Sequence, residues 1–84
     1  METPLWLDKA KIKKSLDARP FLASGEHPLE KVICEIAKMN PGEIFEIITP
    51  FVPEPMIAKI RSLGFGSFTR EEAPGLFRTY FLKQ

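Results

Sequence analysis

The chain has 84 residues, of which 44% are hydrophobic and 27% are charged, and this length and composition predict one globular domain. Its formal net charge is only +1, so no nucleic-acid partner is expected. Its single cysteine excludes an internal disulfide and a zinc site built from cysteines. No apolar run approaches the ~20 residues of a membrane span, and the first residues lack a signal-peptide pattern, so a cytoplasmic protein is expected.

Residues 1–13 are predicted to form an N-terminal arm, and residues 14–84 a single domain. Asp8 is suited to cap a short turn of the arm. Trp6 and Leu7 are expected to tie the arm to the domain, because an exposed Trp-Leu pair is costly. The four lysines within 9–14 are interpreted as a solvated flank, with phosphate contacts as the alternative.

A strand, a loop and a helix are predicted next. The strand covers 14–18, and the loop covers 19–26, where Pro20 and the Ser24-Gly25 pair interrupt regular structure. The helix covers 28–39 and begins at Pro28, whose missing N–H is no loss at the first helical position. Its apolar residues recur at helical spacing, and the segment from Asn40 to Gly42 ends it.

The second half of the chain predicts three strands and one helix. The strand at 44–49 is almost continuously apolar, which is typical of a central strand with a parallel neighbour. A helix at 54–63, an edge strand at 67–72 and a last strand at 76–82 follow. A right-handed parallel crossover and a final hairpin then give a βαβαββ order. The predicted fold is a two-layer α/β (α+β) sandwich, a mixed four-stranded sheet with two helices on one face.

Several short motifs, taken in order, resemble the TusA/SirA-like sulfur-carrier family. They are "LDARP" at 16–20, the helix opened by Pro28, "MNPGEIFEIIT" at 39–49 and "LGF" at 63–65. The resemblance covers residues 15–84 and implies the same βαβαββ fold.

The Cys-Pro-x-Pro motif that defines this family is incomplete here. Aligned backwards from the "PGE" at 41–43, its second proline falls on Pro28, its first on Glu26, and its persulfide-carrying cysteine on Gly25. The chain therefore resembles the cysteine-less branch, a domain of unknown function in which a His-Pro pair, here His27-Pro28, opens the helix. Sulfur transfer does not follow from this resemblance, because the nucleophile is absent.

Cys34 is interpreted as an inert, partly exposed cysteine. It lies about a turn and a half after Pro28 and off the apolar stripe of the predicted helix. Glu30, one turn before it, would oppose a thiolate. The alternative is a sulfur-relay protein that works through Cys34 or by docking on a sulfurtransferase.

A candidate binding site is predicted at the carboxyl ends of the two parallel strands, where ligands gather in open α/β sheets. The free N–H groups of the first helical turn open toward the same loops. The candidate residues are Arg19, Gly25, Glu26, His27, Pro28 and Phe51. Four of them also have a structural interpretation. Arg19 would be a solvated arginine, Gly25 a turn glycine, His27 a histidine that precedes a helical proline, and Phe51 an aromatic lid over the core.

The predicted function is a small non-catalytic binding module on a sulfur-carrier-like scaffold, with no catalytic residue, cofactor or metal. The alternatives are the sulfur-relay protein and a small-ligand or metal sensor that uses His27. Glu26 would compete with an anion, which favours a protein or a neutral or cationic ligand over phosphate. The expected partner is another protein, such as one of sulfur metabolism or redox chemistry, and the expected state is a monomer or weak dimer.

The face of the sheet turned away from the helices is expected to carry Ile44, Glu46, Ile48, Arg78 and Tyr80. Such a surface is apolar enough to need a cover. The N-terminal arm, through Trp6, or a partner protein would provide it, and the arm is favoured.

Overall fold

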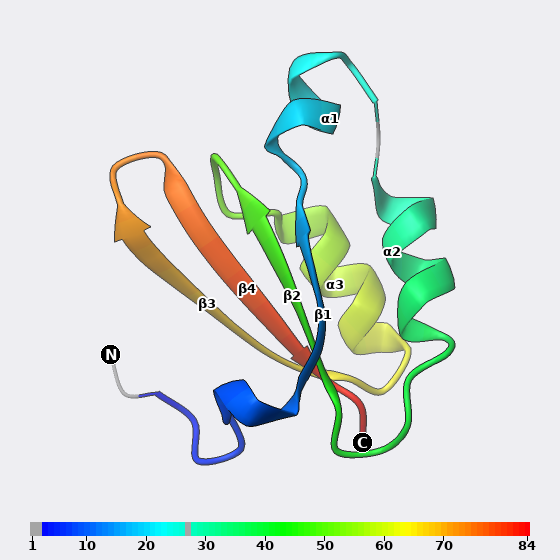
Figure 1. Cartoon of the computed structure of the whole chain (residues 1–84). Coiled ribbons are helices and arrows are strands. Elements are labelled where there is room, and N and C mark those ends of the chain that lie inside the picture. Colours follow the sequence, from blue (N-terminus) through cyan, green and yellow to red (C-terminus); the bar gives the residue numbers. More distant parts are fainter. Residues whose placement is uncertain (1–2, 27) are drawn as a thin grey trace.

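The structure is a computed structural model that describes residues 3–26 and 28–84. Its four strands are β1 (Ile12–Asp17), β2 (Ile44–Thr49), β3 (Gly66–Ala73) and β4 (Leu76–Leu82). Its helices are the 3-10 helix η1 (Lys9–Lys11) and the α-helices α1 (Arg19–Ala23), α2 (Leu29–Ile36) and α3 (Glu54–Ser62) (Figure 1). The candidate residue His27 lies outside the described residues.

One mixed sheet with the order β1-β2-β4-β3 organises the fold. β1 and β2 are parallel, whereas β4 is antiparallel to both β2 and β3. The register places Phe45 of β2 beside Phe81 of β4, so that both side chains point to the same face. The predicted α+β fold with a mixed four-stranded sheet is therefore confirmed.

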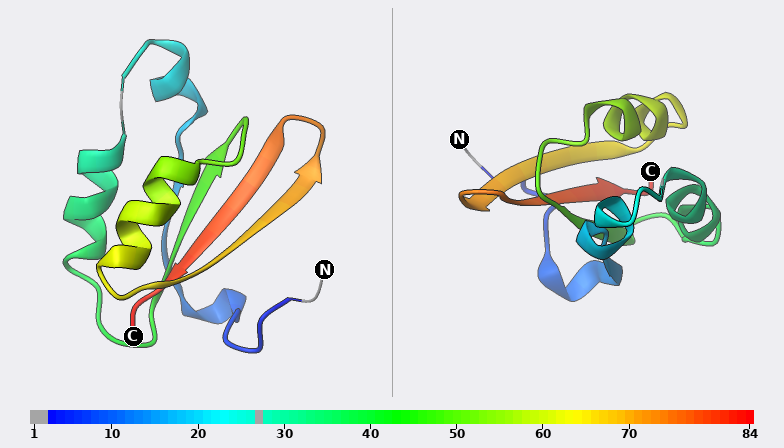
Figure 2. Two further views of the ribbon diagram at one scale, coloured as in Figure 1. Left: turned by 180° about the vertical axis from the view of Figure 1, so that it is seen from behind. Right: turned by 90° about the horizontal axis from the view of Figure 1, so that it is seen from above.

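The helices α2 and α3 lie side by side on one face of the sheet (Figure 2). Each places an apolar stripe on that face, because its buried residues are four positions apart: Val32 and Ile36 in α2, Met56 and Ile60 in α3. These side chains pack against one face of the central strands. The buried core comprises Ala18, Val32, Ile36, Met39, Phe45, Ile47, Met56, Ile60, Phe65 and Phe81.

The structure corrects the expected loop at 19–26, because residues Arg19–Ala23 form the short helix α1. Pro20 stands in its first turn, where the fixed φ of proline favours a helix start. The Ser24 hydroxyl donates a 2.9 Å hydrogen bond to the Phe21 carbonyl at the other end. Leu22 is packed against the core, so the helix has an apolar anchor that the loop interpretation lacked.

The first long helix is shorter than expected. It begins at Leu29 and ends at Ile36 instead of covering 28–39. The N–H groups of Lys38 and Met39 donate to carbonyls three residues earlier, which is the tighter 3-10 pattern common at helix ends. The other expected elements agree with the structure to within two residues, and the bounds of β2 and β4 agree fully.

The N-terminal arm lies on the sheet face opposite to α2 and α3 (Figures 1 and 2). The Ala10 N–H donates a 2.9 Å hydrogen bond to Asp8 Oδ1, which confirms the expected cap. A Cβ placed on Gly66 would lie 4.0 Å from the Trp6 ring, so this half-buried side chain packs against β3. Arg70 Nη2 also contacts Thr3 Oγ1 at 3.3 Å.

These contacts show that the arm covers part of the open face, as expected. Ile44 and Tyr80, which point to that face, are both buried. The first strand begins at Ile12 rather than at residue 14, so the arm ends two residues earlier than expected. None of the helices in the described part of the chain has the length and apolar character needed to cross a membrane.

Candidate functional site

An apolar pocket of about 360 Å³ lies where β1 and β2 end and where α2 and α3 begin. Its walls come from five parts of the chain: α1, the start of α2, the end of β2, the loop that leads into α3, and the first turn of α3. The lining residues are Leu22, Pro28, Leu29, Thr49, Phe51, Pro53, Pro55 and Met56. The volume falls within the range of small-molecule and anchor-residue sites, ~300–1,000 Å³.

Prolines shape the wall that follows β2. Pro53 is buried at the N-cap of α3, and Pro55 stands in the first turn of that helix, where its missing N–H costs nothing. The Thr49 hydroxyl donates a 2.5 Å hydrogen bond to the Phe51 carbonyl, which fixes the start of the loop. Phe51 itself stays 48% exposed, so its ring forms part of the rim rather than the core.

The chemistry of the lining is almost entirely apolar. Among the described residues of the wall, only Thr49 has a polar side chain, and its hydroxyl hydrogen is already donated to Phe51. A ligand with several polar groups would therefore find no side-chain donor in this part of the walls. The pocket suits an apolar group that enters from a partner or ligand whose polar atoms stay outside.

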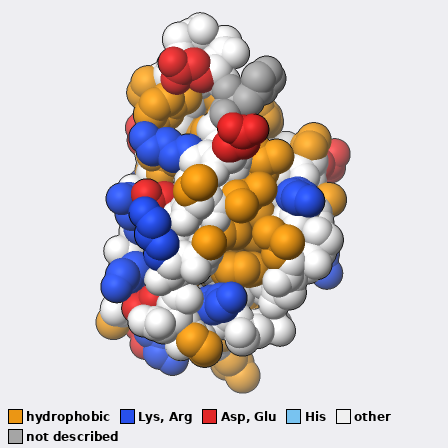
Figure 3. Space-filling model, turned by 90° about the vertical axis from the view of Figure 1, so that its right-hand side faces the viewer, with side chains coloured by type: hydrophobic (Ala, Val, Ile, Leu, Met, Phe, Trp, Pro, Cys, Tyr) orange, Lys and Arg blue, Asp and Glu red, His pale blue; other side chains and the backbone are white. Residues whose placement is uncertain are grey.

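Hydrophobic side chains also gather on the side of the molecule that carries α2 and α3 (Figure 3). Leu29 and Ile57, one from each helix, are only partly buried where they pack against the core. Leu29 also lines the pocket, so the pocket shares this residue with the apolar side of α2.

Two of the predicted site residues line the pocket, namely Pro28 and Phe51. Arg19, Gly25 and Glu26 do not line it. Gly25 has a φ of 85°, and a Cβ added at this position would meet no atom within 4 Å, which is the geometry of a plain turn glycine. The prediction for His27 lies outside the described residues.

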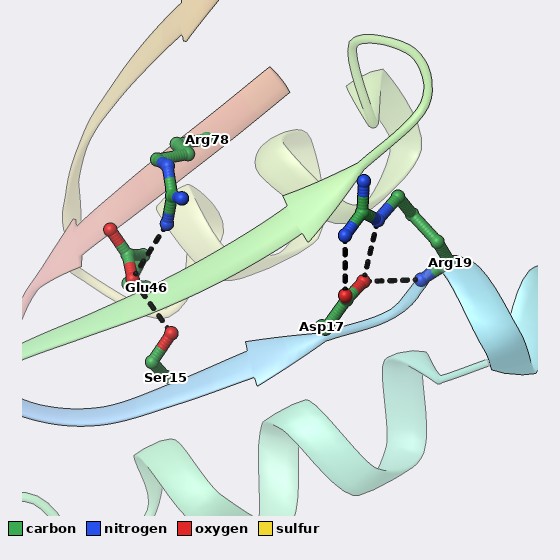
Figure 4. Close-up of polar contacts among 5 residues, drawn as sticks. All are labelled: Ser15, Asp17, Arg19, Glu46 and Arg78. Atoms are coloured by element: carbon green, nitrogen blue, oxygen red, sulfur yellow. Dashed lines mark hydrogen bonds and ion pairs between the residues drawn. The ribbon is translucent and has the colours of Figure 1, made fainter. Parts of the chain in front are cut away.

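Arg19, which does not line the pocket, points toward Asp17 (Figure 4). Its guanidinium donates hydrogen bonds of 2.9 and 2.7 Å to the two carboxylate oxygens of Asp17. These two hydrogen bonds use two of the five N–H donors of the guanidinium and hold the Arg19 side chain against its neighbour. The pKa of Asp17 is lowered as a result, chiefly by the hydrogen bond from Arg19.

Sequence reasoning missed six of the lining residues: Leu22, Leu29, Thr49, Pro53, Pro55 and Met56. Three prolines within residues 50–55 could have indicated a rigid loop capable of forming a pocket wall. Leu22 had no such signal, because it was placed in an irregular loop. Its position in the wall depends on the unexpected helix α1.

A second polar cluster lies on the open face of the sheet (Figure 4). Glu46 is buried, accepts a 2.6 Å hydrogen bond from the Ser15 hydroxyl, and pairs with Arg78 Nη1 at 3.3 Å. Arg78 also pairs with Glu72. Burial and the nearby Glu46 carboxylate raise the pKa of Tyr80. Since these groups satisfy one another, the cluster stabilises the sheet rather than presenting a ligand site.

Cys34 is exposed on α2 and does not line the pocket. Across residues 3–26 and 28–84, no three His, Cys, Asp or Glu side chains come together as a metal site would require. Comparison of the chain with protein-family models, with curated proteins and with solved structures gave no match in any of the three. Among the described residues, the apolar pocket is therefore the main candidate for a binding site.

Proposed function

We propose that this protein is a small non-catalytic interaction module, built on a scaffold like that of the TusA/SirA-like sulfur carriers. Its pocket at the ends of β1 and β2 receives an apolar side chain of a partner protein. The observation that carries this proposal is the described pocket wall, in which the single polar side chain, Thr49, already has a hydrogen-bond partner. The proposal keeps the cytoplasmic location expected from the sequence.

The lining favours a protein over a polar metabolite as the occupant. Sites for small molecules normally combine apolar walls with a few polar groups that converge on the ligand, and the described lining offers no free side-chain donor. A partner protein can insert one side chain and leave its own backbone polar groups in water. Binding energy at protein interfaces is concentrated in such anchored side chains.

The family resemblance supports the choice of this end of the molecule. Pro28, which aligns with the second proline of the family motif, lies at the start of α2 and lines the pocket. Gly25, which replaces the carrier cysteine, cannot carry sulfur. The sulfur-relay and His27-sensor alternatives remain predictions, and the exposed position of Cys34 on α2, outside the pocket lining, favours neither.

The test is an NMR titration of the protein with N-acetyl-phenylalaninamide and N-acetyl-leucinamide as apolar probes. Signals of Leu22, Leu29 and Met56 should shift, because these residues line the pocket. Phe51→Ser should weaken binding by about fivefold or more, which corresponds to the ~1 kcal/mol of a contributing contact.

Val52→Ser is the matched control. Val52 is 41% exposed, close to the 48% of its neighbour Phe51, yet it does not line the pocket. It should bind the probes as the wild type does. Shifts confined to the open sheet face, or equal loss of binding in both variants, would refute the proposed function.

A further inference from the structure

A polar hollow of about 590 Å³ lies at the other end of the sheet from the apolar pocket, where β1 and β2 begin. Its lining comes from residues 10–13, which join η1 to β1, and from residues 41–43, which lead into β2. Both segments lie at the lower end of the sheet (Figure 1). We propose that this polar hollow binds the phosphate group of a small phosphorylated molecule, a role separate from that of the apolar pocket.

Two of the four lysines within residues 9–14, Lys11 and Lys13, line the polar hollow, and both are exposed. Lys11 takes part in none of the ion pairs found among residues 3–26 and 28–84. Lys13 Nζ lies 3.5 Å from Glu43 Oε2, and this single contact leaves further N–H donors of an ammonium group that has three. Two ammonium groups in one lining suit an oxyanion with more than one negative charge, and lysine is a common phosphate ligand.

An irregularity in β1 gives Lys13 its place in the lining. Ile12 pairs with Ile44 and Lys14 pairs with Phe45, so Lys13 is one extra residue in the ladder between β1 and β2. A bulge of this kind interrupts the alternation of side chains between the two faces and redirects the extra residue. In a regular strand Lys13 would pair with Ile44, whereas here its side chain reaches Glu43 in the preceding loop. The bulge therefore directs a cation to the polar hollow.

Glu43 is the acidic residue of the lining, and both of its carboxylate oxygens are engaged. Oε1 accepts a 2.7 Å hydrogen bond from the Asn40 N–H, and Oε2 faces Lys13. The backbone N–H groups of residues 10–12 and 42–43 also donate within the protein. With two lysines and one glutamate the lining has a net positive charge, and the lysine ammonium groups are its side-chain donors. An anion therefore fits this lining better than a neutral polar ligand.

The size of the polar hollow favours a small molecule as the source of the phosphate group. Its volume lies within the range of small-molecule sites, ~300–1,000 Å³. A nucleic acid would need a basic surface that follows several phosphates, and the net charge of the whole chain is only +1.

The test is an NMR titration with inorganic pyrophosphate and, separately, with acetate, in ~150 mM NaCl so that distant charges are screened. Pyrophosphate should shift the amide signals of Lys11, Lys13 and Gly42, and acetate should bind more weakly. Lys11→Gln should weaken pyrophosphate binding about threefold, the effect of one exposed ion pair. Lys9→Gln is the matched control: it removes the same charge from an exposed residue of η1 that does not line the polar hollow, and it should bind pyrophosphate as the wild type does.

A short thymidine oligonucleotide tests nucleic acid as the other source of phosphate groups, and it should bind no tighter than pyrophosphate. Tighter binding of the oligonucleotide at the same residues would overturn the assignment to a small molecule. The absence of shifts with pyrophosphate, equal binding of acetate, or equal weakening by Lys9→Gln and Lys11→Gln would overturn the site itself. The proposed function is tested with apolar probes at the other end of the sheet, so the two proposals can fail separately.

Discussion

The guanidinium of Arg19 binds the carboxylate of Asp17 through two hydrogen bonds, and the Arg19 backbone N–H donates a third of 3.1 Å to the same group. Asp17 is the last residue of β1 and Arg19 is the first of α1. The pair therefore fixes the turn that brings Leu22 to the pocket. Arg19, predicted from the sequence as a ligand contact, therefore also has a structural role in this turn.

Arg19→Gln should raise the pKa of Asp17 toward its ordinary value, because the hydrogen bond from Arg19 is the main cause of its lowering. Carboxyl-carbon NMR shifts measured against pH would show the change. A carboxyl group with a lowered folded-state pKa adds stability above its ordinary pKa, and that contribution disappears as pH falls through the folded-state value. The difference in the free energy of unfolding between wild type and variant should thus be small, because the pair is exposed. It should disappear as the pH falls through the folded-state pKa of Asp17. Arg61→Gln, on α3, should leave the Asp17 titration unchanged.

Tyr80 is the single tyrosine of the chain, so phenolate absorbance reports its titration directly. Its pKa should be above the ordinary value of ~10, mainly because the side chain is buried and also because Glu46 is near. Glu46→Gln should lower it, though not to the value of a free tyrosine. A group with a raised folded-state pKa stabilises the fold below its unfolded pKa, and this contribution is lost as pH rises through the folded-state value. Urea unfolding should therefore show stability declining above pH about 10. A pKa of Tyr80 at or below the ordinary tyrosine value would contradict the buried position of this side chain.

Trp6→Ala should destabilise the protein by about 1–2 kcal/mol, less than the ~3–5 kcal/mol typical of a fully buried tryptophan, because this ring is half-buried against β3. Leu5→Ala is the control from the same arm. Leu5 is fully exposed, so its removal should change the free energy of unfolding by no more than about 0.5 kcal/mol. Both values come from urea denaturation. Equal effects of the two substitutions on the free energy of unfolding would mean that packing of the arm on the open face of the sheet does not stabilise the protein.

Cys34 should not become persulfidated when the protein is incubated with a cysteine desulfurase and its substrate L-cysteine, from which the enzyme forms the persulfide whose outer sulfur it transfers to an acceptor thiol. Its exposed thiol should still react fully with a maleimide in the folded protein, which shows that access is not the limit. Intact mass spectrometry distinguishes the two modifications, with Cys34→Ser as the blank. A gain of one sulfur atom in the wild type, absent from Cys34→Ser, would instead support the sulfur-relay alternative.

The order of the elements could be predicted because its signals are local. The apolar run of β2 is bounded by Gly42 and Pro50, and its predicted limits match the structure. Helical spacing in 29–36 and 56–60 likewise identified the buried stripes of α2 and α3. Such periodicities and breakers act within a few residues, so they can be interpreted without knowing what packs against them.

The composition of the pocket and the cover of the open face depend on tertiary packing. The pocket needs Leu22 from α1, Pro28 from the start of α2 and Met56 from α3, which are brought together only when the strands pair. Trp6 likewise packs beside Gly66, which lies in the second half of the chain. Contacts between remote segments leave no periodic signal in either segment. Local patterns along the chain therefore specify the sheet and the helices α2 and α3, whereas packing specifies which surface is available for binding.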